Sequence, residues 1–232
     1  RGFKKLLAIP NHFAKYYFEN GADEILYIDL VASLYRRSKL TSILRETVKD
    51  VFIPITVGGG IRKVEDVVDL LNSGADKVAI NTAAVENPDL IKQVSRKFGS
   101  QCMVLYVEAK KINVNKWEVY TDCGREKTGI DVMTWVKRAE NLGAGEILLT
   151  SIDKEGTQKG FDIDLISQVN EIVNIPVIAS GGYGDFEDIK NLLLKTKVSG
   201  CAIAHSLHYK KNTIYDIKKN CDLNNFNVRM NE

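Results

Sequence analysis

The sequence predicts an α/β fold, a (β/α)8 TIM barrel built from two duplicated halves. Two observations predict it. Short apolar runs alternate with longer amphipathic stretches along the chain, as in folds with a central parallel sheet. Segments of the first half also return in the second half at a constant spacing of 122 residues, and a constant period indicates a repeated structural unit.

The repeat rests on three separate matches. Residues 53–60 (IPITVGGG) return as residues 175–182 (IPVIASGG), residues 65–67 as residues 187–189, and residues 21–26 as residues 143–148. Three matches at one spacing indicate a tandem duplication. We therefore expect a single domain with half-barrels at about residues 1–100 and 101–232.

Seven apolar runs are predicted to be strands. They are β-rich, are bounded by Gly or Pro and mostly lack polar alternation, as expected of strands buried on both faces. They are residues 25–28, 53–57, 78–80, 103–107, 147–149, 176–179 and 201–204. By the repeat, the counterpart of the run at Met103 falls before Arg1, so we expect the first of eight strands to be missing from this chain.

The predicted helices lie between these runs. Apolar side chains recur at helical spacing in residues 64–71. The same pattern is present in residues 90–98, 133–142, 163–173 and 186–194. Residues 112–121 form a hairpin-like stretch that is predicted to be an extended loop over the mouth of the barrel, where mouth means the end at which parallel strands terminate.

Composition excludes several classes of protein. The chain has 232 residues, 44% of them hydrophobic, and a formal net charge of +2, which argues against disorder and against a dedicated nucleic-acid binder. No apolar run approaches the roughly 20 residues that span a bilayer. The four cysteines are scattered, which favours free thiols in a reducing, cytoplasmic compartment over disulfides or a zinc site.

Barrels of this type place the active site at the mouth. Glycine-rich strand ends can hold a phosphate with backbone N–H groups, and here such ends occur twice. We expect substrate and phosphate binding by Asp29, Gly59, Gly60, Asn81, Thr82, Thr150, Gly156, Gly181, Gly182, His205 and Ser206. Two equivalent phosphate sites imply an elongated ligand with a phosphate at each end.

Carboxylates at the same strand ends are candidate acids and bases. Glu108 ends the fifth predicted barrel strand, Asp153 and Glu155 follow the sixth, and Asp29 has the equivalent place on the second. A carboxylate in a barrel mouth can act as general acid or base when burial or another carboxylate raises its pKa.

Charged residues also stand at the opposite end of the strands, the floor of the barrel. Glu24, Lys77 and Glu146 begin three predicted strands. Charges that point into a barrel need mutual pairing to offset desolvation. They are interpreted either as surface salt bridges or as a charged ring that gates an axial passage.

These segments resemble one enzyme family. Residues 53–62 (IPITVGGGIR), 74–85 (GADKVAINTAAV), 143–153 (GAGEILLTSID), 156–157 and 175–182 are similar to the cyclase subunit of imidazole glycerol phosphate synthase, a duplicated (β/α)8 barrel. The resemblance implies that ammonia from a separate glutaminase subunit closes the imidazole ring of a bisphosphorylated ribulosyl-formimino-aminoimidazole carboxamide ribotide. It implies no cofactor or metal, a glutaminase on the floor, and an ammonia gate at Glu24, Lys77 and Glu146.

The chain departs from the family pattern at three positions. The family's catalytic aspartates end strands one and five; the first falls before Arg1 and the second position is Glu108. Glu155 likewise replaces an aspartate, and His205 stands where the family usually has a small residue. Glu108 and Glu155 are our candidate catalytic residues, although an extra methylene moves a carboxylate and misplacement of about 1 Å can cost roughly 10²-fold in rate.

Two alternatives remain open at this point. The first is a non-cyclising paralogue that docks a glutaminase and conducts ammonia for the amidation of a bacterial surface sugar. This alternative accounts for the glutamates at the two acid positions and for the charged residues retained at the floor. The second is the ribosyl isomerase of the same pathway, which is also a duplicated two-phosphate barrel. The motif at residues 143–153 and the charged floor favour the cyclase.

Overall fold

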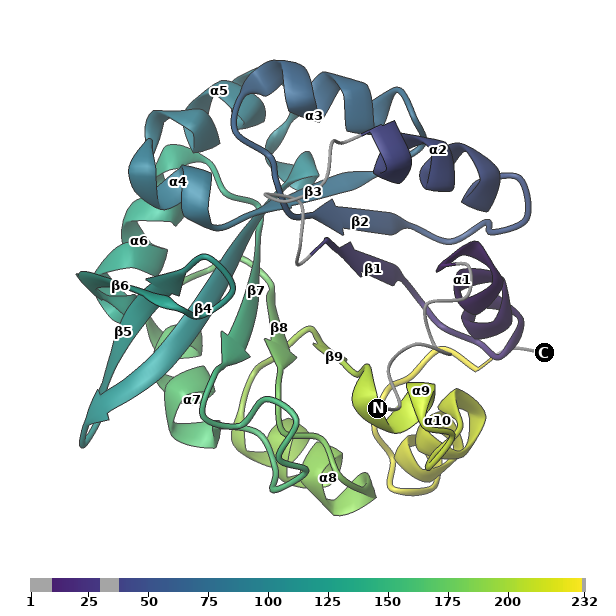
Figure 1. Cartoon of the computed structure of the whole chain (residues 1–232). Helices are drawn as coiled ribbons and strands as arrows, with labels where there is room; N and C mark the ends of the chain where they lie inside the picture. The colour runs from purple at the N-terminus through teal and green to yellow at the C-terminus, as the bar shows by residue number, and fades with distance from the viewer. Residues whose placement is uncertain (1–9, 30–37, 231–232) are drawn as a thin grey trace.

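The computed structural model describes residues 10–29 and 38–230 (Figure 1). Seven of its strands pair in parallel in the order β1-β2-β3-β4-β7-β8-β9. Figure 1 shows this sheet curving into a nearly closed barrel with helices around it, as the sequence predicts. The strand that we expect to be the first of eight falls before Arg1 and so lies outside the described residues.

The parallel strands coincide with the seven predicted apolar runs. They are β1 (Ile25–Ile28), β2 (Ile55–Gly58), β3 (Lys77–Ile80), β4 (Met103–Asn113), β7 (Glu146–Ser151), β8 (Val177–Ser180) and β9 (Gly200–Ala202). β4 is longer than its predicted run because it continues into a hairpin. β9 is shorter than its run, since helical structure begins at His205.

Helices follow most strands and cover the outside of the barrel (Figure 1). Those described are α1 (Pro10–Glu19), α2 (Ser38–Thr47), α3 (Val64–Leu71), α4 (Thr82–Glu86), α5 (Asp89–Phe98), α6 (Val132–Leu142), α7 (Ile163–Ile172), α8 (Phe186–Lys195), α9 (His205–His208) and α10 (Ile214–Leu223), with a 3-10 turn at Ser100–Cys102. Side-chain caps fix several of their starts: Asp131 accepts from Thr134 N at α6, and Thr213 from Asp216 N at α10.

Hydrogen bonds repeat between the two halves of the chain. Ile25 N donates to the Pro54 carbonyl at 2.9 Å, and Ile147 N donates to the Pro176 carbonyl at the same distance. Asp66 accepts from Arg62 N, as Asp188 accepts from Gly184 N, both at 2.8 Å. Each pair is related by the 122-residue spacing, so the duplication read from the sequence extends to individual contacts.

The repeat shifts by one residue near its end. Gly58 pairs with Ala79 in the first half, whereas Ser180 pairs with Ala202 in the second. The β8-to-β9 connection is therefore one residue longer than its counterpart. As a result, His205 rather than Ala204 takes the place of Thr82, the first residue of α4.

Alternation along the strands creates two apolar regions. On β4 the outward side chains belong to the main core under the helices, while Val104 and Tyr106 point to the barrel axis. The axial cluster has Ala79, Val104 and Leu148 at its centre, with Ile28, Tyr106, Ile178 and Ala202 packed against it. This apolar layer separates the charged floor from the mouth.

Residues 112–121 lie in a β-hairpin, as their hairpin-like pattern indicated, but they are paired strands rather than an extended loop. β4 extends to Asn113 and continues into two antiparallel strands, β5 (Lys116–Thr121) and β6 (Glu126–Asp131). Trp117 is fully buried, whereas Val114 at the hairpin tip is 78% exposed and does not line the mouth. The buried tryptophan explains the difference, because it fastens the segment to the protein as a β-hairpin.

The described helices are also too short or too polar for a transmembrane segment. Within residues 10–29 and 38–230, none contains an apolar stretch sufficient to cross a membrane.

Candidate active site at the barrel mouth

Two cavities open side by side at the mouth, with volumes of about 640 and 520 Å³. The first is lined mainly by residues of the first half of the chain and the second by residues of the second half. Ile28, Tyr106, Glu108 and Cys123 line both. The cavities therefore meet at the end of β4, and a long ligand would pass Glu108 at its middle.

The residues predicted for the mouth line these cavities, with the exception of Asp153. The first cavity includes Asp29, Gly59, Gly60, Asn81, Thr82 and Glu108. The second includes Glu108, Thr150, Glu155, Gly156, Gly181, Gly182, His205 and Ser206. The structure thus brings together strand ends that lie far apart in the sequence.

Glycine is required at equivalent positions of the two cavities. Gly59 has φ +95°, and a Cβ there would lie 2.3 Å from the Asp29 carbonyl oxygen. Gly181 has φ +90°, and its Cβ would lie 2.9 Å from the Ser151 carbonyl oxygen. Both pairs obey the 122-residue spacing. A side chain at either position would clash with the backbone. Glycine avoids this clash and leaves the backbone of both turns accessible to a ligand.

Both carboxylate oxygens of Glu108 receive a hydrogen bond. Asn81 Nδ2 donates to Oε2 at 2.8 Å, and the Tyr106 hydroxyl donates to Oε1 at 3.3 Å. The side chain is buried, with 7% exposure. Burial raises the pKa of Glu108 above its ordinary value, and the hydrogen bonds from Asn81 and Tyr106 partly oppose the rise. Glu108 is therefore a fixed carboxylate suited to proton transfer.

Asn81 offers a hydrogen-bond acceptor to the first cavity. Its Nδ2 is used by Glu108 and by the Tyr120 carbonyl. Its buried Oδ1 has no partner among the described residues. A buried amide oxygen without a donor costs free energy, so a ligand N–H or O–H at this point would be favoured.

Glu155 is the second perturbed acid. It lines the second cavity, and burial raises its pKa, opposed by the nearby charge of His205. Asp153 has a different position, because its Oδ2 accepts from Lys111 N at 2.7 Å. Asp153 therefore braces the hairpin, while Glu155 remains available to the cavity.

A polar chain borders the second cavity. Gln158 Nε2 lies 3.2 Å from His205 Nε2, and Lys211 Nζ donates to Gln158 Oε1 at 2.7 Å. His205 and Gln158 line the cavity. Together with the Gly181 turn, this chain gives the second cavity a set of donors suited to an anion.

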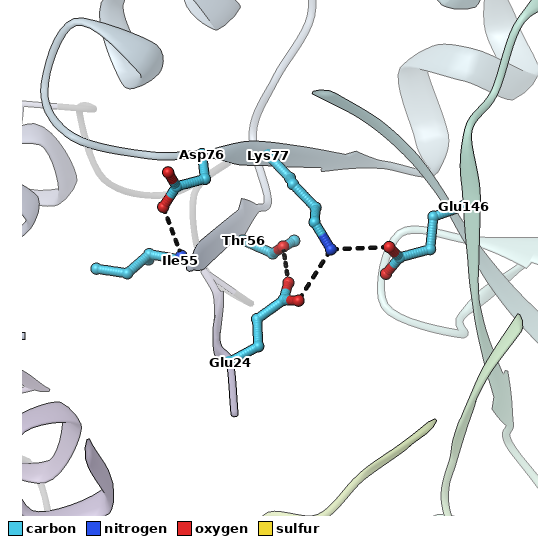
Figure 2. A network of polar contacts seen from close by, with 6 residues as sticks. All are labelled: Glu24, Ile55, Thr56, Asp76, Lys77 and Glu146. Atoms are coloured by element: carbon cyan, nitrogen blue, oxygen red, sulfur yellow. Dashed lines mark hydrogen bonds and ion pairs between the residues drawn. The ribbon is translucent and has the colours of Figure 1, made fainter. Parts of the chain in front are cut away.

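The floor charges form a network inside the barrel (Figure 2). Lys77 Nζ lies between two carboxylates, 2.9 Å from Glu24 Oε2 and 2.8 Å from Glu146 Oε2. Glu24 also accepts a hydrogen bond from Thr56. The three side chains come from different strand starts and meet at Lys77 Nζ; Lys77 and Glu146 are partly buried, whereas Glu24 is exposed.

Some mouth residues were missed by the sequence reasoning. Tyr106, Arg62, Gln158 and His208 all line a cavity. Tyr106 had a usable signal, because it stands two residues before Glu108 on the same strand and so faces the same way. His208 Nδ1 lies 2.6 Å from the Tyr17 hydroxyl. No local pattern marks Gln158 or His208, whose partners are distant in sequence.

Over the described parts of the chain, no group of three or more His, Cys, Asp or Glu side chains could hold a metal ion.

Comparison with known proteins identifies close relatives. The family model described as "Histidine biosynthesis protein" matches residues 4–213. The chain is 58% identical over 184 residues to imidazole glycerol phosphate synthase subunit HisF of Legionella pneumophila, covering 79% of this chain and 87% of the relative.

Two relatives of lower identity carry the same name. HisF of Prochlorococcus marinus strain AS9601 is 50% identical over 90% of this chain and 82% of its own length. HisF of Streptococcus mutans is 47% identical over 90% of this chain and 84% of its own length. These names support neither the ammonia-conducting paralogue nor the ribosyl isomerase.

Proposed function

The chain belongs to the histidine biosynthesis protein family, and we propose that it works as the cyclase subunit of imidazole glycerol phosphate synthase. It closes the imidazole ring of the bisphosphorylated ribulosyl-formimino-aminoimidazole carboxamide ribotide with ammonia. The observation that carries this proposal is the geometry of the mouth. Two cavities with equivalent glycine turns meet at one buried carboxylate.

Each cavity binds one phosphate of the substrate. In the first, the turn at Gly59 and Gly60 and the start of α4 at Thr82 supply backbone and hydroxyl donors. In the second, the turn at Gly181 and Gly182 does so together with His205 and Ser206. Backbone N–H groups in such turns donate hydrogen bonds to phosphate and do not themselves titrate near neutral pH. The reacting centre then lies between them, at Glu108.

Glu108 and Glu155 perform the acid–base steps. Ring closure requires a proton to leave the incoming nitrogen and a proton to reach the departing groups. Glu108 is held on both oxygens, and burial raises the pKa of both acids. A carboxyl group with a raised pKa can both accept and donate protons near neutral pH. Asn81 Oδ1 accepts a hydrogen bond from the substrate beside Glu108.

Ammonia enters at the floor, past Lys77. Its ion pairs with Glu24 and Glu146 close the axis below the apolar layer (Figure 2). Opening the axis requires one of these ion pairs to separate. The glutaminase subunit docks over this face, so that ammonia passes from one active site to the other without entering solvent.

Turnover with ammonium salt tests the cyclase proposal directly. The purified chain is mixed with the bisphosphorylated ribotide and an ammonium salt, and loss of the ribotide's absorbance is followed. We expect turnover by the wild type and loss of it in Glu108→Gln. Phosphate binding without turnover by the wild type would overturn the proposal.

A second assay tests the partner. With a glutaminase subunit of the same family and glutamine in place of ammonium, we expect turnover and a heterodimer by size-exclusion chromatography. Absence of a complex, in the presence of ammonium-dependent turnover, would contradict the docking proposal and leave the cyclase proposal standing.

A further inference from the structure

Tyr106 occupies an unusual position inside the barrel. Its ring packs in the axial apolar layer with Ala79, Val104 and Leu148. It also lines both cavities of the mouth. The side chain therefore extends from the interior of the barrel to the point where the two halves of the proposed substrate site meet.

The hydroxyl of Tyr106 contacts Glu108, the proposed acid. It donates to Glu108 Oε1 at 3.3 Å, and Asn81 Nδ2 donates to Oε2 at 2.8 Å. A backbone hydrogen bond from Gly124 also stabilises the carboxylate and is unaffected by changes at Tyr106. Because both oxygens carry donors, the carboxylate can rotate about its terminal bond only by breaking some of these contacts. The 3.3 Å contact is long for an O–H···O bond, and catalytic hydrogen bonds often tighten when substrate binds.

A longer acid needs such support. Glutamate has one more rotatable bond than aspartate, so its carboxylate samples more positions, and a displacement of about 1 Å is costly to catalysis. Tyr106 and Glu108 are two residues apart on β4 and point to the same side. The strand itself therefore fixes the spacing between the tyrosine ring and the carboxylate.

We propose that Tyr106 is a positioning residue that holds the Glu108 carboxylate in its reactive orientation. Its ring anchors in the apolar layer and its hydroxyl binds Oε1, while Asn81 holds Oε2. The expected effect on catalysis rests on the proposed cyclase function. The contact between Tyr106 and Glu108 can be measured independently of turnover.

The test variant is Tyr106→Phe, which keeps the ring and removes only the hydroxyl. We expect kcat with ammonium to fall about tenfold to hundredfold, with the ribotide's KM within about twofold, since the phosphate sites are intact. The limb of the pH–rate profile that Glu108 sets should move to higher pH, because a donor that favours the carboxylate has been removed.

A direct titration separates this inference from the proposed function. ¹³C-glutamate NMR of the wild type, with the Glu108 signal assigned by its loss in Glu108→Gln, gives the protonation midpoint. We expect the midpoint to rise by about 0.5–1 pH unit in Tyr106→Phe. Asp122, Cys123 and Glu155 also face this region, and they are unchanged in the variant.

Tyr27→Phe is the matched control. Tyr27 lies on β1, and its hydroxyl contacts the Pro10 carbonyl and Thr47 among the outer helices. It should change neither the Glu108 midpoint nor kcat. An unchanged midpoint in Tyr106→Phe overturns the inference whatever happens to turnover, and so does a raised midpoint with unaltered kcat and pH profile. If the wild type itself shows no turnover, the proposed function fails. The Glu108 protonation midpoint then still tests whether the Tyr106 hydroxyl binds the Glu108 carboxylate.

Discussion

Single residues at the mouth combine function with a cost in stability. Glu108 is buried against Asn81 and Tyr106, and burial raises its pKa. A carboxyl whose pKa is higher in the folded state than in the unfolded state lowers the stability of the fold once it ionises. The raised pKa that suits Glu108 for proton transfer therefore also destabilises the folded protein at neutral pH.

Glu108→Gln should reduce ammonium-dependent kcat by about 10²–10⁴-fold, the usual contribution of a general acid or base. It should also change the pH dependence of stability. Between the ordinary glutamate pKa of about 4.3 and neutrality, the wild type should lose unfolding free energy relative to the variant as pH rises. Urea unfolding of both proteins at pH 4 and pH 7 measures the difference. A constant difference across this range would show that burial does not raise the pKa of Glu108.

His205→Ala should weaken binding in the second cavity only. Removing one hydrogen-bonding side chain costs about 1 kcal/mol, so the ribotide's KM should rise about fivefold. His12→Ala on the exposed face of α1 is the control. An unaltered KM would mean that His205 makes no contact with the substrate.

At the scale of elements, the hairpin of β4, β5 and β6 is fastened to a helix. Asp162 accepts from Trp117 Nε1 at 3.0 Å and from Ser151 Oγ at 3.2 Å, and it also caps α7 through Leu165 N at 3.3 Å. One carboxylate thus joins the hairpin, the end of β7 and the start of α7. The turn between β5 and β6 includes Cys123, which lines the mouth.

Asp162→Ala should lower the unfolding free energy by about 3 kcal/mol. The variant loses a helix cap and leaves the buried donors of Trp117 and Ser151 unpaired. Asp131→Ala is the matched control, because Asp131 caps α6 from an exposed position and should cost about 1 kcal/mol. Equal losses in urea unfolding would show that Asp162 acts as a cap alone.

The barrel as a whole is joined across its axis at the floor. Lys77 at the start of β3 pairs with Glu24 beside β1 and with Glu146 at the start of β7. Strands that are not neighbours in the sheet are thereby linked. Burial alone would lower the pKa of Lys77, but the hydrogen bonds and charges of Glu146 and Glu24 raise it above its ordinary value.

Lys77→Met should lower the unfolding free energy at pH 7 by about 1–3 kcal/mol, because two carboxylates, of which Glu146 is partly buried, lose their partner. A raised lysine pKa stabilises the fold below the unfolded value of about 10.4, and this contribution is lost as pH rises through the folded pKa. The difference between wild type and variant should therefore shrink above about pH 10.5. Lys49→Met, which removes an exposed pair with Glu46, should cost less than about 1 kcal/mol.

Much of the fold could be predicted because its signals are local. The buried parallel strands, the helices between them and the 122-residue repeat are visible in composition and spacing alone. The exception was the stretch at residues 112–121, whose strand structure depends on Trp117 reaching Asp162. Partners 45 residues apart leave no local pattern, so the segment was predicted to be a loop.

The candidate site divides in the same way. Glycines at strand ends and acids after strands identified the mouth, because a parallel barrel brings all strand ends to one place. The half-barrel boundary near residue 100 and the role of each site residue stay predictions. The chain of Lys211, Gln158 and His205 was not foreseen, since it forms across 53 residues.

The amino-acid sequence by itself determined the barrel, its duplication and the set of side chains at its two ends, because the alternation of strands and helices is a local pattern and the repeat is a match between segments of the sequence itself. The tertiary structure alone decided which atoms meet there. Whether Glu108 is held by Asn81 and Tyr106, and Lys77 by Glu24 and Glu146, depends on strand register and side-chain direction across the axis. Those are long-range quantities, fixed only when the sheet closes around the axis.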